Sequence, residues 1–166
     1  MSITSSPAQP PTTDQILFGL ENGAQFPPLE PIFALWNAKR GNREMPERGD
    51  IAPRDMKAYL RHVQIFDVVD GGRDFRIRVM GTIFIDAIGY DPTGQLVSEL
   101  SDPILRERLS IACRRVVETR KPLRVTAPFR ATSVVLYDKV ETILLPLGTE
   151  SKTTHVLRQV ILVKRK

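Results

Sequence analysis

The sequence is poor in the residues that carry most catalytic and metal chemistry. It has one cysteine and two histidines in 166 residues, so an internal disulfide is excluded. A zinc-type site needs three or four converging ligands, and neither His62 nor His155 lies near a cysteine or clustered carboxylates. Cys113 borders an apolar stripe, where a small hydrophobic residue belongs, and no base accompanies it. We therefore expect no metal, no catalytic residues and no enzymatic activity.

Long hydrophobic runs are also missing. No apolar segment approaches the ~20 residues that span a membrane, and the opening MSITSSPAQPPTT lacks the basic start and apolar centre of a signal peptide. A single cysteine suits a reducing compartment. We expect a cytoplasmic protein without a membrane partner.

The charge is basic but unevenly placed. The formal net charge is +5, and residues 103–130 hold eight Arg or Lys against Glu107 and Glu118. A solvated basic helix explains this excess, and the terminal Lys164-Arg165-Lys166 is typical of a solubilising tail. No helix-turn-helix pattern, zinc signature or aromatic stacking sequence accompanies the charge, so we expect no specific nucleic-acid binding.

Length and composition predict one globular domain with an extension, since 42% of the residues are apolar. Residues 1–26 are predicted to be a flexible tail with a short apolar patch at 16–20. Residues 27–166 are predicted to form a single domain, with helices inside 28–60 and a sheet-and-helix core over 62–163.

Periodicity places the helices and strands. One helix has its apolar face at Leu29, Ile32, Phe33 and Trp36, which are spaced i, i+3, i+4 and i+7, and a second is expected from Ile51 to Leu60. The longest helix runs from Pro103 to about Thr119 behind a cap at Asp102. Strands are predicted at 62–69, 74–80, 123–130, 140–147 and 156–163. The glycines at 71–72 mark a hairpin, so the first two strands should be antiparallel neighbours.

These elements predict an α+β fold, a five-stranded antiparallel sheet with helices packed on one side and an N-terminal helical extension. The organising segment is 75–94, where a strand passes through a glycine into a short apolar helix and a tight polar turn. The residues assigned to turn structure are Gly81, Asp91, Thr93 and Gly94. For all four, turn chemistry is favoured over contact with a ligand.

Several short motifs occur in an order that spans residues 28 to 163. They are Leu35-Trp36 with Arg40-Gly41, Met45-Pro46-Glu47-Arg48 before Asp50-Ile51, Phe75 to Thr82, Gly89-Tyr90-Asp91 with Thr93-Gly94, Arg114 to Val117 with Lys121-Pro122, and Leu144 to Leu147. In these motifs the sequence resembles the PAS sensory-domain family, and more narrowly its small single-domain bacterial branch. The resemblance implies a sheet that cradles a pocket beneath helices, with roles in ligand sensing, dimerisation or partner docking.

Pocket candidates are inward-facing apolar residues of the predicted elements, each of which could equally be plain core. They are Ile77, Val79, Ile83, Ile88, Leu109, Val125 and Leu145. Flavin-binding relatives place a reactive cysteine in a polar motif that is missing here, and haem-binding relatives usually supply a histidine from the long helix, which has none. We expect no bound flavin or haem.

Two arginines of the long helix complete the candidate set. Arg108 and Arg115 run between two apolar ridges of the helix, and two interpretations stay open. Their stems can cover apolar surface with the charges in water, or one of them can reach the pocket mouth and hold an anionic ligand or a partner carboxylate.

The sequence therefore predicts a non-enzymatic PAS-type sensory or regulatory module. It would act through an unidentified signalling protein, with or without a small-molecule ligand. The alternative is a dedicated sensor or carrier of an anionic small molecule. We also expect a homodimer whose interface uses Leu29, Ile32, Phe33 and Trp36, unless that helix folds back on its own sheet.

Overall fold

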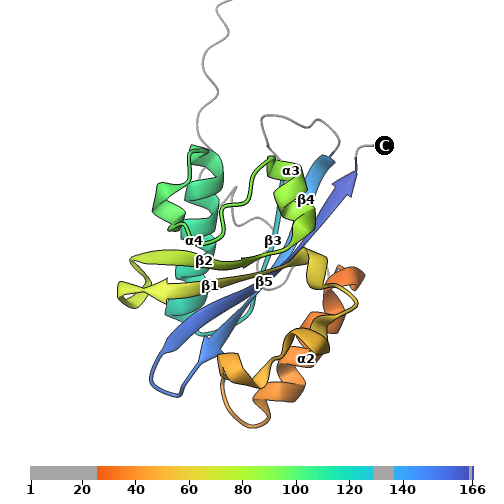
Figure 1. The fold of residues 1–166 in the computed structure, drawn as a ribbon. Helices are drawn as coiled ribbons and strands as arrows, with labels where there is room; N and C mark the ends of the chain where they lie inside the picture. Colours follow the sequence, from red (N-terminus) through yellow and green to blue (C-terminus); the bar gives the residue numbers. More distant parts are fainter. Residues whose placement is uncertain (1–25, 129–136, 165) are drawn as a thin grey trace, which may run out of the picture.

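The computed structural model of the protein describes residues 26–128, 137–164 and 166 (Figure 1). The helices are α2 (Glu30–Arg40), α3 (Thr82–Ile88) and α4 (Pro103–Thr119), and the strands are β1 (Val63–Val69), β2 (Asp74–Met80), β3 (Leu123–Pro128), β4 (Tyr137–Gly148) and β5 (Thr153–Lys164). Short 3-10 turns lie at η1 (Pro27–Leu29), η2 (Arg48–Asp50), η3 (Pro53–Met56), η4 (Leu60–His62), η5 (Asp70–Gly72) and η6 (Val97–Glu99). The predicted tail up to residue 25, its apolar patch and the last two residues of the predicted strand 123–130 lie outside the described residues.

The described strands form one antiparallel sheet in the order β2-β1-β5-β4-β3. The predicted hairpin is confirmed, because β1 pairs with β2 from Val69↔Asp74 to Gln64↔Met80. The C-terminal strand β5 lies at the centre of the sheet, between β1 and β4. Residues from both halves of the chain therefore meet on the same sheet surface.

The predicted α+β fold is confirmed, with the five-stranded antiparallel sheet and the helices α3 and α4 on one of its faces. The predicted N-terminal helical extension, α2, covers the other face. On one face, α3 and α4 pack over a core that includes Phe66, Leu144 and Val160. On the other face, α2 packs over a second core that includes Leu145 and Leu157. Figure 1 shows α2 across the sheet from α4. Adjacent strand residues point to opposite faces, so one strand supplies both cores.

A β-bulge changes the alternation of β2. Ile65 pairs with Val79 but Phe66 pairs with Ile77, so Arg78 is an extra residue on β2. Phe75 and Ile77 face α4, whereas Val79 packs with the α2 core and Met80 returns to the α4 core. A strict two-residue period, as predicted, assigns Val79 to the wrong face.

The helix predicted from Ile51 to Leu60 is replaced by short 3-10 turns. Two of the short turns in this region are each held by a carboxylate: in η2 the Asp50 side chain accepts from Glu47 N at 2.8 Å, and in η3 the Asp55 side chain accepts from Ala52 N at 2.9 Å. These local bonds compete with a continuous helix. The segment still delivers Ile51 and Met56 to the α2-side core.

Gly81 marks the passage from β2 into α3. A Cβ built there would lie 2.2 Å from the carbonyl oxygen of Arg61 and 2.9 Å from that of Val63, both backbone atoms. After α3, Asp91 Oδ1 accepts from Thr93 N at 3.0 Å and from Thr93 Oγ1 at 2.6 Å. Gly94, with φ +92°, donates its N–H to Ile77 O at 2.7 Å. These contacts hold the 89–94 turn against β2.

Candidate ligand-binding site

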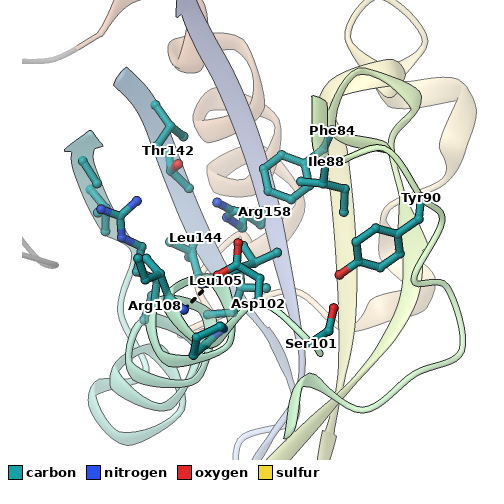
Figure 2. A pocket seen from close by; sticks show the side chains of 17 residues that line it. Phe84, Ile88, Tyr90, Ser101, Asp102, Leu105, Arg108, Thr142, Leu144 and Arg158 are labelled. Carbon is teal, nitrogen blue, oxygen red and sulfur yellow. Dashed lines mark hydrogen bonds between the residues drawn. The ribbon is translucent and has the colours of Figure 1, made fainter. Parts of the chain in front are cut away.

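A cavity of about 310 Å³ lies between α4, α3 and the sheet (Figure 2). It is lined by Phe84, Ile88, Tyr90, Ser101, Asp102, Pro103, Ile104, Leu105, Arg108, Leu109, Ala112, Val125, Ala127, Val140, Thr142, Leu144 and Arg158. The most exposed of these, Tyr90, Ser101 and Pro103, place an opening beside the N-terminus of α4. The size lies at the lower end of the range for small-molecule sites.

The wall on the helix side follows from helical spacing. Ile104 and Leu105 begin it, Arg108 and Leu109 lie one turn further on, and Ala112 closes it, so one stripe of α4 faces the sheet. The helix begins where Asp102 Oδ1 accepts from Ile104 N at 2.9 Å and from Leu105 N at 3.2 Å. The carboxylate of Asp102 is thus engaged as the helix cap.

The wall on the sheet side comes from alternate residues of β3, β4 and β5. Leu144 and Arg158 are cross-strand partners, and Thr142 pairs with Val125 in the neighbouring row. Small or aliphatic side chains fill most of these positions. Arg158 is the exception, a cation near the middle of the central strand.

Arg158 is buried, with 7% of its surface exposed, and that remainder faces the cavity it lines. Its Nη1 donates to Gln64 Oε1 on the adjacent strand β1. Its guanidinium carbon lies 5.3 Å from the centroid of the Phe84 ring, a favourable cation–π position. Figure 2 shows Arg158 between Phe84 and Thr142.

In the part of the chain that the structure describes, the charge of Arg158 is not paired with a carboxylate. None of the ion pairs among the described residues includes it. Burial lowers the pKa of Arg158 to about 10; Cys113 acts in the opposite direction and the charge of Arg108 adds to the lowering. Arg158 is therefore still a cation at neutral pH, in a place where an uncompensated charge is costly.

A comparison with protein families decides the identity of this fold. The family model described as a PAS domain matches residues 24–161. The chain belongs to the PAS domain family. A comparison with curated proteins finds no match.

Solved structures similar to this PAS domain include two sensory proteins. One is an RNA-binding light-oxygen-voltage receptor, with 18% identity and a TM-score of 0.43 over 70% of this chain and 36% of that one. The other is a sensory box histidine kinase/response regulator from Burkholderia thailandensis, with 14% identity and a TM-score of 0.42 over 68% of this chain and 85% of that one. The PAS domain therefore spans little more than a third of the receptor chain.

The cavity of the PAS domain includes some of the residues expected at a pocket. Ile88, Leu109, Val125 and Arg108 line it. The interpretation that one of the two arginines holds an anionic ligand at the pocket mouth stays a prediction for Arg108.

The other pocket candidates lie elsewhere and are corrected here. Ile77 is fully buried in the α4-side core but does not line the cavity, and Ile83 is half-buried and does not line it either. Val79 and Leu145 belong to the α2-side core, because of the bulge in β2 and the register of β4. Arg115 is exposed on α4, outside the cavity.

The proposed dimer residues are also corrected. Leu29, Ile32 and Trp36 are buried in the core that α2 makes with its own sheet, and Trp36 Nε1 donates to Pro146 O at 2.8 Å. Phe33 is half-buried beside them. These side chains are therefore not an apolar surface that needs a second copy to cover it.

Arg158, which lines the cavity, and its hydrogen-bond partner Gln64 were not among the sequence candidates. Arg158 and Gln64 each lie in a strand that is mainly apolar or β-branched, and a polar side chain at a core position of a strand covered on both faces is itself a signal. Cys113 is buried in the α4-side core, and burial raises the pKa of its thiol to about 12, against the opposing effect of Arg158. It stays a neutral thiol at physiological pH.

The described residues add two observations about what the domain holds. They contain no group of three or more His, Cys, Asp or Glu side chains arranged to hold a metal ion. Within the same part of the chain, no helix has the length and apolar character needed to cross a membrane.

Proposed function

We propose that this PAS domain is a sensory and regulatory module that binds a small molecule in the α4 cavity and signals to a partner protein without catalysing a reaction. The observation that carries the proposal is the cavity itself, a space of about 310 Å³ left between well-packed elements. Protein interiors are normally packed to the density of organic crystals. A space of this size, open beside the N-terminus of α4, is therefore a place that a small molecule can enter and fill with apolar contacts.

The arrangement of α3 offers a route from cavity to surface. Phe84 and Ile88 line the cavity, while Asp86 on the same short helix is exposed. The chain then continues through exposed Tyr90 at the opening. A ligand that moves the inner side of α3 would therefore change the surface that a partner meets. The partner, a homodimer and a cytoplasmic location all stay predictions.

Native mass spectrometry and thermal unfolding of the full chain test the binding step. Freshly purified protein should carry a small molecule or be stabilised by members of a metabolite library. Ala112→Leu extends a side chain into the cavity and should abolish that binding while preserving the fold. Ser110→Leu, on the same helix but outside the cavity, is the matched control and should bind like the wild type.

The signalling step has its own test. A partner recovered with the wild type and the Ser110→Leu control, but in altered amount with Ala112→Leu, would support coupling between cavity and surface. Failure of every library member and of native mass spectrometry to reveal a ligand would contradict the proposal.

A further inference from the structure

Building on the proposed function, we infer that the cavity is selective for an aliphatic monocarboxylate whose carboxylate pairs with Arg158 while its chain lies along α4. The inference names the class of ligand, which the fold alone does not. It rests on one buried cation, on what surrounds it and on the size of the space beside it.

Among residues 26–128 and 137–164, no acidic side chain forms an ion pair with this cation. The side chains beside Arg158 in its own row of the sheet are Gln64 on β1 and Leu144 on β4, and neither carries a charge. The acidic residue in the cavity wall, Asp102, caps α4 with the bonds already described. Buried charges in proteins are paired or bound to an opposite charge, so an anionic ligand is the expected counterpart.

The free edge of the guanidinium suits a carboxylate. Arginine has five N–H donors in a planar fork, and Gln64 takes a hydrogen bond from Nη1. Among the described residues, no hydrogen bond from Arg158 Nε or Nη2 is found. This edge can make two parallel bonds to a planar carboxylate. Gln64 and Phe84 hold the guanidinium in place for that contact.

The remainder of the cavity suits an aliphatic body. Apart from the arginines and Asp102, its wall is mainly aliphatic, with Leu105 and Leu109 on α4 and Leu144 beside Arg158 on the sheet. A cavity of about 310 Å³ lies at the lower end of the range for small-molecule sites, so we expect a ligand with a short chain. Octanoate is such a ligand, and Arg108 in the same wall adds positive potential at the site.

Titration calorimetry of the full chain with octanoate, 1-octanol, octylamine and octyl phosphate tests the inference. Octanoate should bind about 10- to 100-fold more tightly than 1-octanol, the gain expected from a charged, bidentate contact, and octylamine should not bind. Arg158→Met should remove that preference while 1-octanol still binds. Arg115→Met, which removes an exposed arginine of α4, should leave octanoate binding unchanged.

The comparison of octanoate with 1-octanol on the wild type needs no variant, so it holds even where Arg158→Met fails to fold. Equal binding of the two, or tighter binding of octyl phosphate, would overturn the carboxylate assignment. Should another molecule occupy the cavity and be expelled by Ala112→Leu while octanoate does not bind, the ligand class is wrong and the proposed function stands. If nothing binds, both fail.

Discussion

Arg158 on β5 and Gln64 on β1 face each other across two antiparallel strands, and the arginine donates from Nη1 to the amide oxygen of the glutamine. Each is buried. The amide nitrogen of Gln64 has no hydrogen-bond partner within the described residues. The glutamine is therefore in this position mainly as an acceptor for the guanidinium.

Replacing that acceptor should destabilise the domain. Gln64→Leu leaves a buried arginine without its hydrogen bond, which we expect to lower the free energy of unfolding by about 1.5–3 kcal/mol. Urea denaturation followed by circular dichroism measures it. In the double variant Gln64→Leu with Arg158→Met, both polar groups are gone, and stability should return to the wild-type level or exceed it. A double variant less stable than Gln64→Leu alone would show that the pair is not coupled in this way.

A carboxylate built beside Arg158 should compete with an anionic ligand. Gln64→Glu places a negative charge opposite the guanidinium, so octanoate should bind about tenfold or more weakly while 1-octanol binds as before. Titration calorimetry compares the two. Gln95→Glu adds the same charge at an exposed position and serves as the control. Unchanged octanoate affinity in Gln64→Glu would show that the carboxylate of the ligand does not bind to Arg158.

Gly81 should tolerate no side chain. The methyl group of Gly81→Ala would collide with two backbone carbonyls that cannot move aside, the nearer at 2.2 Å. We expect a loss of about 3 kcal/mol or more, measured by urea denaturation. Gly49→Ala is the matched control, because a Cβ there has nothing within 4 Å, and it should change stability by less than about 0.5 kcal/mol. Equal stability of the two variants would mean that β2 and α3 do not meet as described.

Much of the fold could be predicted because local rules were enough for it. Asp102 followed by Pro103 set the start of α4, and the glycines at 71–72 set the β1–β2 hairpin. The residues of α2 were recognised from their spacing. The surface against which α2 packs could not be predicted, because an apolar stripe indicates a buried face without showing what covers it.

The errors at the candidate site have two physical sources. A bulge adds one residue to β2 without a sequence pattern to mark it, and every later side chain changes face, as Val79 does. On β4, apolar residues occupy both faces, so alternation could not separate Leu144 from Leu145. The apolar residues around Arg158 predict a strand, but they do not indicate that the arginine faces a cavity.

The corrected position of α2 makes a prediction of its own. Ile32 is fully buried between α2 and the sheet, so Ile32→Ala should lower the free energy of unfolding by about 2–5 kcal/mol. Its mass in light scattering should match that of the wild type, whatever the oligomeric state. Ala34→Ser, at an exposed position of the same helix, should change neither quantity. A change in the mass of Ile32→Ala without a loss in its free energy of unfolding would show that Ile32 lies in an interface between copies of the chain.

The thiol of Cys113 should make stability fall at alkaline pH. Burial raises its pKa to about 12 from an ordinary value of 9.0, so above about pH 9 the unfolded chain loses this proton while the folded chain keeps it. The contribution is complete below the unfolded pKa and is lost as pH rises toward the folded one. Between about pH 8 and about pH 10.5 the loss should reach about 2 kcal/mol. Urea denaturation of the wild type and Cys113→Ala isolates it, since other groups titrate in both. Parallel pH profiles would show that the thiol ionises freely in the folded domain.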